Sequence, residues 1–288
     1  MAQKIYLVIG AAGQLGHDLM RVFGSRGRGF THRDLEITKW EAVWEKIRSI
    51  KPAVVVNTAA FHKVEECERQ PEQAYAVNVL GAYYIARAAK EVGAAMVYVS
   101  TDYVFGDEKE VYRETDCPRP LNVYGASKLA GEELTRITNP RSYIVRTSAL
   151  FGIKQSGKGY NFVTLMLKLA KKNQEIKVVN DQFTAPTYTL DLAQKIKELV
   201  ERPAPFGVYH ITNQGGCSWY ELAKTIFKKT DTPANLKPIS SAERPANLVR
   251  PRSTILKNQA LMKLGIKPMR PWSEGFMAYL LELEEKTQ

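Results

Sequence analysis

The sequence contains few cysteines, and none is placed for a cross-link or for metal binding. Cys67, Cys117 and Cys217 are spread over 288 residues without a CxxC pair. An odd number at such spacing predicts neither a disulfide framework nor a zinc site. We therefore expect no metal in the chemistry of the protein.

Long hydrophobic runs are also missing. The charge-free apolar stretches, Ile5–Gly16 and Ala53–Phe61, are much shorter than the ~20 residues that span a bilayer. The first four residues lead directly into an apolar segment and lack the layout of a signal peptide. The sequence thus predicts a soluble, cytoplasmic protein with no membrane partner.

Blocks of one charge are absent, although the chain is basic overall. Lys and Arg number 41 against 30 for Asp and Glu, a net charge of +11 that favours anionic ligands. The basic residues are scattered, with no run of five or more. This distribution is typical of a solvated basic surface, so we expect no nucleic-acid partner.

Apolar segments of strand length alternate with helical segments through the first half of the chain. Strands are expected at Ile5–Ile9, Val54–Asn57, Met96–Ser100 and Tyr143–Arg146, and helices from Gln14, over 71–92 and from Val123 toward Leu134. Continuously apolar strands separated by helices are typical of a parallel sheet covered on both faces. The predicted fold class is α/β, a doubly wound parallel (Rossmann) sheet with a smaller mixed α/β C-terminal domain.

The pattern becomes less regular after Phe151, where we place the domain boundary. Residues 1–151 form the first predicted domain and 152–288 the second, and a return of the chain to the first near 176–201 stays open. The second domain is expected to contain short strands and helices. These are the strands at 177–179 and 208–211 and the helices over 161–172, 190–201 and 218–229.

A glycine-rich turn follows the first strand directly. Gly10, Gly13 and Gly16 are spaced three apart, with Gln14 and Leu15 between the last two. Glycines between a buried strand and a helix let the backbone approach a pyrophosphate and direct helix N-terminal N–H groups toward it. The turn therefore predicts a dinucleotide-binding site in the first domain.

The choice of dinucleotide depends on the residues about 20 positions further on. An acidic residue there would bind the ribose of NAD, whereas a 2′-phosphate needs a cation. Arg33 supplies such a cation, so NADPH is the expected cofactor, and Asp34 next to it keeps NADH open.

A tyrosine and a lysine four residues apart lie on one face of a helix. Both Tyr124/Lys128 and Tyr220/Lys224 have this spacing, but only the first pair follows a strand that ends in a hydroxyl residue, Thr101. The carboxyl ends of parallel strands line the ligand crevice, where Thr101 and Tyr124 could meet. A solvated surface pair is the alternative.

These residue types suit the reduction of a ketone. Hydride transfer leaves negative charge on the carbonyl oxygen, which requires a proton donor. Lowering a tyrosine pKa from near 10 by about three units takes roughly 4 kcal/mol of phenolate stabilisation. A nearby ammonium and an oxidised nicotinamide could supply this together. We expect Tyr124 to be an unusually acidic phenol, Thr101 to bind the carbonyl oxygen and Lys128 to hold the nicotinamide ribose.

The sequence resembles the extended short-chain dehydrogenase/reductases, and within them those that reduce the 4-keto group of dTDP-linked deoxysugars. The matching segments are Gly10–Gly16, 35–38, 57–61, 76–78, Ser100–Phe105, Pro120–Glu132, 181–187, 207–210, 218–221 and 250–253. The resemblance implies that Thr101, Tyr124 and Lys128 are the catalytic trio and that a dTDP-sugar is the substrate.

Further site residues follow from the same resemblance. Glu36 and Ile37 would border the adenine, and Ala59, Ala60 and Phe61 would lie along the cofactor. Asp102 and Tyr103 would contact the sugar, with Arg250 and Arg252 as candidates for its diphosphate. Asn78 would brace the structure behind the site.

Three positions depart from the family pattern. Ala149 stands where a tryptophan that packs on the sugar is expected, and Thr184 where glycine is usual. Some relatives bind magnesium through acidic residues at a dimer contact, where Asp18 replaces an expected Glu. A homodimer stays open, as do an epimerase, a reductase of another nucleotide sugar and a non-catalytic dinucleotide-binding regulatory subunit.

Overall fold

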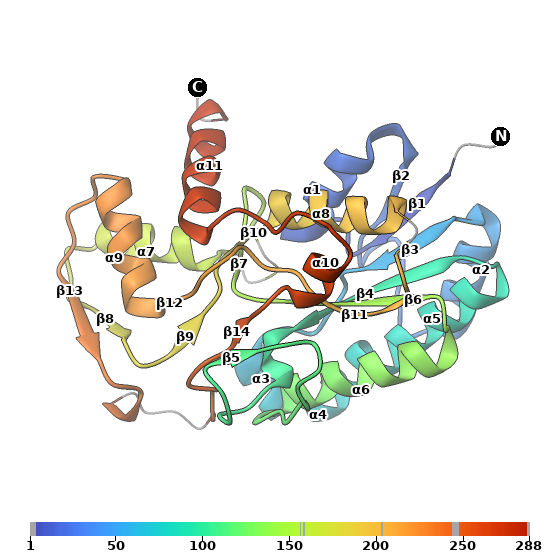
Figure 1. The fold of residues 1–288 in the computed structure, drawn as a ribbon, viewed down its shortest axis with the longest axis horizontal. Coiled ribbons are helices and arrows are strands. Elements are labelled where there is room, and N and C mark those ends of the chain that lie inside the picture. The colour runs from blue at the N-terminus through green and yellow to red at the C-terminus, as the bar shows by residue number, and fades with distance from the viewer. Residues whose placement is uncertain (1–3, 156, 158, 203, 244–247, 287–288) are drawn as a thin grey trace.

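The computed structural model describes residues 4–155, 157, 159–202, 204–243 and 248–286. A six-stranded, wholly parallel sheet lies at its centre (Figure 1). In spatial order the strands are β2 (Gly27–Phe30), β1 (Tyr6–Ile9), β3 (Val54–Asn57), β4 (Ala95–Thr101), β6 (Ser142–Thr147) and β11 (Gly207–His210). The strand order reverses direction at β1 and β3, which is the doubly wound α/β arrangement that the sequence predicted.

Helices cover both faces of this sheet. One face carries α1 (Gln14–Phe23) and α8 (Thr189–Glu201), and the other carries α2 (Trp40–Ile50), α5 (Ala82–Glu91) and α6 (Val123–Thr138). In β1, Tyr6 and Val8 pack in the apolar cluster under α1 and α8, and Leu7 and Ile9 pack in the cluster on the opposite face of the sheet. Strands buried on both faces explain the continuously apolar runs.

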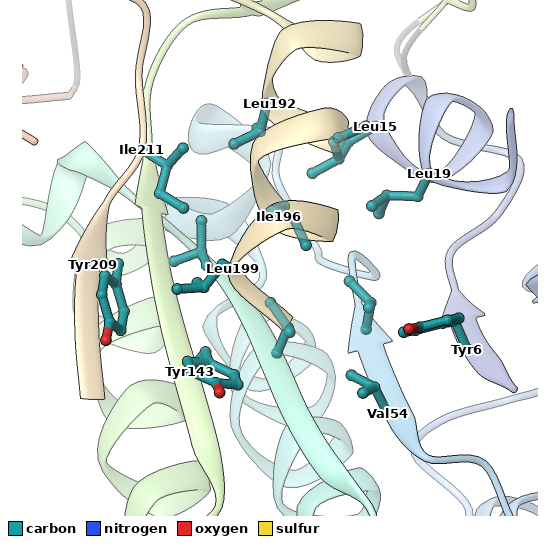
Figure 2. Packing of buried hydrophobic residues seen from close by; sticks show 14 of the residues in the cluster. Tyr6, Leu15, Leu19, Val54, Tyr143, Leu192, Ile196, Leu199, Tyr209 and Ile211 are labelled. Atoms are coloured by element: carbon teal, nitrogen blue, oxygen red, sulfur yellow. The ribbon is translucent and has the colours of Figure 1, made fainter. Parts of the chain in front are cut away.

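The α1/α8 layer joins two distant parts of the chain. Figure 2 shows Leu192 and Ile196 of α8 packed beside Leu15 and Leu19 of α1, over the sheet. Tyr143 of β6 and Tyr209 of β11 continue this cluster toward the sheet edge. Residues 207–210, which the sequence grouped with the second domain, therefore pair with β6 and extend the first sheet.

The helix expected over 71–92 is not a single α-helix. It consists of α4 (Pro71–Tyr75), a π-helical segment η2 (Ala76–Gly81) and α5. The Asn78 side chain accepts a hydrogen bond from the Phe61 backbone N–H at 2.8 Å and donates one to Ser127 Oγ at 3.0 Å. The wider turn thus places a side chain that ties η2 to the loop after β3 and to α6. Such π-helical turns are frequent at functional sites.

Segments that follow β6 form a smaller second layer, which lies beside the sheet on the left of Figure 1. Its helices α7 (Phe162–Ala170), α9 (Trp219–Lys229) and α11 (Trp272–Glu285) pack around a separate apolar cluster. Its short strand pairs are β7 (Leu150–Phe151) with β10 (Thr187–Tyr188), β8 (Ile176–Val179) with β13 (Leu236–Ile239), and β9 (Phe183–Thr184) with β12 (Cys217–Ser218). The division into domains at Phe151 stays a prediction.

Short elements complete the chain. They are η1 (Gly24–Arg26), α3 (Val64–Arg69), η3 (Asp102–Val104), η4 (Ser241–Glu243), α10 (Gln259–Lys263), and the pair β5 (Val111–Tyr112) with β14 (Ile255–Leu256). Of the helices in the described part of the chain, none is both long and apolar enough to cross a membrane.

Candidate active site

A cavity of about 450 Å³ opens at the carboxyl ends of the central strands, between the sheet and the second layer. This is the edge at which open α/β sheets bind ligands. Its wall includes eleven of the residues that the sequence selected. They are Gly13, Gln14, Leu15, Gly16, Ala60, Thr101, Asp102, Tyr103, Tyr124, Lys128 and Arg250.

The glycine turn forms one end of this cavity. Gly10 has φ +88°, and a Cβ atom there would lie 2.5 Å from Thr58 Oγ1 and 2.9 Å from the Ala59 backbone nitrogen. A Cβ on Gly16 would lie 2.8 Å from Ala11 Cα. Gly10 and Gly16 therefore permit the tight approach of α1 to the turn. The first N–H groups of α1 have no partner inside the helix, and its first turn carries no acidic residue, so this end suits a phosphate.

The loop after β2 starts beside this turn, because the Gly10 and Ala11 backbone N–H groups both donate to the Phe30 carbonyl. Arg33 is exposed in this loop and does not line the cavity. Asp34 accepts hydrogen bonds from the Thr31 backbone N–H and hydroxyl, at 2.8 and 2.7 Å, which lower the pKa of its carboxyl group. The Asp34 carboxylate is thus already hydrogen-bonded to Thr31, whereas the Arg33 side chain is exposed to solvent.

Five more predicted residues lie outside the cavity wall. Glu36 accepts hydrogen bonds from Thr38, and Ile37 is buried against Gly81. Ala59 donates its backbone N–H to Asn57 Oδ1 and Phe61 donates to Asn78. Both therefore hold the loop from which Ala60 reaches the cavity. The Arg252 side chain is exposed, and its backbone N–H donates to Asp107.

Thr101 and Tyr124 both line the cavity. Thr101 ends β4, and Tyr124 lies in the first turn of α6, whose N-cap Asn122 accepts a hydrogen bond from Gly125. The Thr101 hydroxyl acts on the Tyr124 phenol and lowers its pKa. Burial raises the pKa of Tyr124 well above its ordinary value, and the Asp102 carboxylate adds to the rise. The expected acidity of this phenol includes the charge of an oxidised nicotinamide, so it stays a prediction.

Lys128, four residues after Tyr124 on α6, makes its contacts with the sheet. Its Nζ atom donates to the Val99 carbonyl oxygen at 2.7 Å and lies 4.1 Å from the centre of the Tyr98 ring. Burial lowers the pKa of Lys128 to about 7, although Glu132 opposes the shift. Its amine therefore contacts the sheet and the ring of Tyr98.

A buried ion pair between Glu132 and Arg146 lies one helical turn from Lys128. Glu132 is fully buried and accepts three hydrogen bonds from the Arg146 guanidinium, the shortest at 2.7 Å, and one from Ser100 at 2.5 Å. Both carboxylate oxygens are thus committed to Arg146 and Ser100. This arrangement places one negative charge a helical turn from Lys128 without a direct bond to it.

Arg250 reaches the cavity from the other side. Its side chain forms an ion pair with Glu65, and its charge acts to lower the pKa of the Tyr103 phenol. With only 15% of its side chain exposed, it is a positioned cation at the cavity wall. An anionic group that enters there would find this cation already placed.

Sequence reasoning missed the residues that the second layer contributes. Ser148, Thr184 and Thr254 bring buried hydroxyls to the cavity, and Phe162 and Trp219 bring rings whose centres are 4.7 Å apart. Ser148, Phe162 and Thr254 lie outside the segments that match the family, whereas Thr184 and Trp219 lie inside them. Of the departures from the family pattern, Thr184 gave a usable signal, because it adds a hydroxyl where glycine was expected.

The other two departures have clear structural settings. Ala149 lines the cavity with φ +42°, a conformation that L-residues rarely adopt. Asp18 is buried and accepts hydrogen bonds from Arg21 at 2.8 Å and from Thr189 at 2.6 Å. Among the described residues, no group of three or more His, Cys, Asp or Glu is placed to hold a metal ion. The absence of a metal from the chemistry and the homodimer both stay predictions.

Comparisons with known proteins show the family to which the chain is related. The model of the RmlD substrate binding domain matches residues 4–285. The chain is 40% identical to the spore coat polysaccharide biosynthesis protein SpsK of Bacillus subtilis strain 168, with 96% of each chain covered. It is 38% identical to a dTDP-4-dehydrorhamnose reductase of Streptomyces griseus, over 93% of this chain and 90% of the other.

A solved structure is also similar over nearly the whole chain. The dTDP-4-dehydrorhamnose reductase of Bacillus anthracis, crystallised in complex with NADP, is 37% identical. It superposes with a TM-score of 0.93 over 98% of this chain and all of that chain.

Proposed function

Because the chain belongs to the RmlD substrate binding domain family, we propose that it is an NADPH-dependent dTDP-4-dehydrorhamnose reductase. The reaction would reduce the 4-keto group of dTDP-4-dehydro-L-rhamnose to give dTDP-L-rhamnose. The observation that carries this proposal is the meeting of Thr101, Tyr124 and Lys128 in one cavity with the glycine turn. The names of the relatives support the same reaction.

The residues present fit a dinucleotide. The Gly10–Gly16 turn and the N-terminus of α1 would hold its pyrophosphate, because the glycines keep the backbone accessible and the first turn of α1 carries no acidic residue. Arg33 would pair with a 2′-phosphate, and the occupied state of Asp34 supports NADPH over NADH. When bound, the nicotinamide supplies the hydride.

Tyr124 would supply the proton. A neutral phenol is the form that a proton donor needs before the reaction, and burial together with Asp102 maintains that form. The O–H bond of Tyr124 would break as a new O–H bond forms on the ketone oxygen. The product leaves with one hydride and one proton added, and the phenolate recovers its proton from solvent.

Lys128 would position groups without itself transferring a proton. Its bond to the Val99 carbonyl fixes its Nζ atom at the end of β4, beside the cavity. Of its three hydrogens, the carbonyl takes one, which leaves others for ribose hydroxyls.

The second layer would hold the rest of the substrate. Arg250 suits a diphosphate, since a guanidinium can bind two phosphate oxygens at once. Phe162 and Trp219 give the same wall an apolar aromatic surface. A cation next to aromatic rings suits a nucleoside diphosphate, because the cation can bind the phosphates and the rings can contact the base.

Purified protein supplied with NADPH and dTDP-4-dehydro-6-deoxy-L-mannose tests the proposal. We expect stoichiometric loss of reduced-nicotinamide absorbance and a product whose NMR spectrum identifies dTDP-L-rhamnose. An epimerase would change the sugar without net cofactor consumption, and a regulatory subunit would bind cofactor without turnover. Either outcome would refute the reductase.

A further inference from the structure

One buried side chain joins the first turn of α6 to the segment that carries Arg250. Asn122 is the N-cap of α6, and its Oδ1 atom accepts a hydrogen bond from the Gly125 backbone N–H at 2.9 Å. Its Nδ2 atom donates to the Val249 carbonyl oxygen at 3.1 Å. Asn122 is 8% exposed, so both bonds are largely shielded from water. The side chain therefore links two segments that are 127 residues apart.

The two partners determine the orientation of the Asn122 amide. Gly125 offers a donor and Val249 an acceptor, so only one of the two amide orientations satisfies both. Asn, Asp, Ser and Thr all serve well as N-caps. Of these, only Asn carries a donor on an atom other than the capping oxygen. Helix capping alone thus does not account for the bond to Val249.

The bond to Val249 acts on the next residue, Arg250. The carbonyl group of Val249 and the backbone nitrogen of Arg250 belong to one planar peptide unit. A hydrogen bond to this carbonyl oxygen therefore restrains the backbone of Arg250 as well. The Arg250 side chain is held separately, by the ion pair with Glu65 of α3. Because α3 packs against α6, both the backbone and the side chain of Arg250 are fixed to helices on the Tyr124 side of the cavity.

The spacing between Arg250 and Tyr124 matters for the proposed reaction. Both residues line the cavity, and Tyr124 lies two positions after Asn122. In the proposed function Tyr124 meets the ketone and Arg250 meets the diphosphate of the same substrate molecule. A misplacement of about 1 Å between a substrate and a catalytic group can slow a reaction roughly 100-fold. The two contacts must therefore be held at a matching distance.

We propose that Asn122 is a positioning residue that sets the spacing between the proton donor Tyr124 and the cation Arg250, by holding the Val249–Arg250 peptide against the first turn of α6. The proposal rests on the proposed reductase function. Asn122 itself does not line the cavity, so it acts through Arg250 without contact to the substrate.

The test variant is Asn122→Ser, which keeps a capping oxygen and removes the amide donor. Since Ser caps helices about as well as Asn, α6 should persist and the free energy of unfolding should change little. We expect backbone amide hydrogen exchange to become faster in residues 248–254 and to stay unchanged in α6. Unchanged exchange in 248–254 would overturn the proposal. Asn122→Asp, which also keeps the capping oxygen and lacks the donor, is a second variant with the same expected result.

A matched control perturbs the same turn of α6 without contact to the Val249 peptide. Glu68 of α3 accepts a hydrogen bond from the Val123 backbone N–H at 2.7 Å. Glu68→Ala removes this bond and should leave exchange in 248–254 as in the wild type. Equally fast exchange in E68A and N122S would show that a loosened helix end is sufficient, and would overturn the specific role of Asn122.

The functional role is tested by the kcat for the dTDP-4-keto sugar in four proteins: wild type, N122S, R250A and the double variant. N122S should lower kcat about tenfold, because Arg250 then holds the diphosphate at the wrong distance from Tyr124. In the Arg250→Ala background the same change should have little effect on kcat, since its route through Arg250 is gone. An equal loss in both backgrounds, or an unchanged kcat in N122S, would overturn the proposal.

Hydrogen exchange of the free protein needs no substrate, so its result is separate from that of the reductase assay. A wild type without turnover would refute the proposed function. Faster exchange in 248–254 of N122S would still support the hold of Asn122 on that segment.

Discussion

Lys128 donates a hydrogen bond to the carbonyl oxygen of Val99, 2.7 Å away at the end of β4. The bond holds a 1% exposed amine beside the cavity, in contact with the Tyr98 ring and a helical turn from Glu132. An amine in such a place is more easily deprotonated than one in water. The relationship makes both the stability and the ligand binding of the protein depend on pH.

The stability of the protein should rise with pH because of this lysine. The pKa of Lys128 is about 7 in the folded protein and 10.5 when unperturbed, so between these values the unfolded chain binds more protons. The free energy of unfolding therefore increases with pH over that window. Urea denaturation of wild type and Lys128→Met at several pH values checks this. The variant should lack this contribution to the slope, and equal slopes would contradict the account.

The glycine turn should tolerate alanine at one position and not at another. A Cβ on Gly16 would lie 2.8 Å from Ala11 Cα, whereas the nearest atom to a Cβ on Gly13 is the Gly10 carbonyl oxygen at 3.3 Å. We expect Gly16→Ala to cost about 1–3 kcal/mol of stability, as overpacking does, and to weaken NADPH binding. Gly13→Ala is the milder matched variant. Thermal unfolding and cofactor titration measure both, and a larger loss in G13A would argue against the proposed turn geometry.

Arg33 should decide between the two nicotinamide cofactors. It is exposed in the loop after β2, next to an Asp34 that is bonded to Thr31. Loss of one charge-assisted hydrogen bond to a 2′-phosphate should raise the KM for NADPH about tenfold in Arg33→Ala. The KM for NADH should be unaffected, since that cofactor has no 2′-phosphate. A wild type that prefers NADH would contradict this role.

Arg250 should bind substrate without taking part in the chemical step. Its side chain lines the cavity, while that of Arg252 is exposed outside it. Arg250→Ala should raise the KM for the dTDP-sugar with little change in kcat, the pattern of uniform binding. The same substitution at Arg252 should have a smaller effect. A larger rise in KM for Arg252→Ala than for Arg250→Ala would contradict the proposed contact of Arg250 with the diphosphate.

Local sequence patterns were sufficient for the elements that carry their own signal. The apolar run before Gly10, the glycine spacing after it and the Tyr124/Lys128 interval each predicted the structure observed. The segment at 76–81 has an ordinary helical composition, so its π-helical turn could not be predicted. That turn depends on contacts of Asn78 with Phe61 and Ser127, which are distant in sequence.

The parts of the site that escaped prediction depend on tertiary contacts. Asp102 was expected to touch the sugar, but which partners occupy its carboxyl group depends on Ser148 and Thr254, from separate segments. The raised pKa of Tyr124 likewise follows from burial and from Asp102, neither of which the spacing to Lys128 indicates. Spacing identifies which side chains share a helix face, but not which hydrogen-bond partners they find.

The measurement that tests the account most directly uses NADPH deuterated at the transferred position of the nicotinamide. After turnover of the dTDP-4-keto sugar, NMR should locate the deuterium on C4 of the sugar, and Tyr124→Phe should lower turnover by roughly 10²–10⁴-fold with cofactor binding retained. A product without deuterium at C4 would contradict hydride transfer to the ketone. Near wild-type turnover in Y124F would contradict the phenol as proton donor.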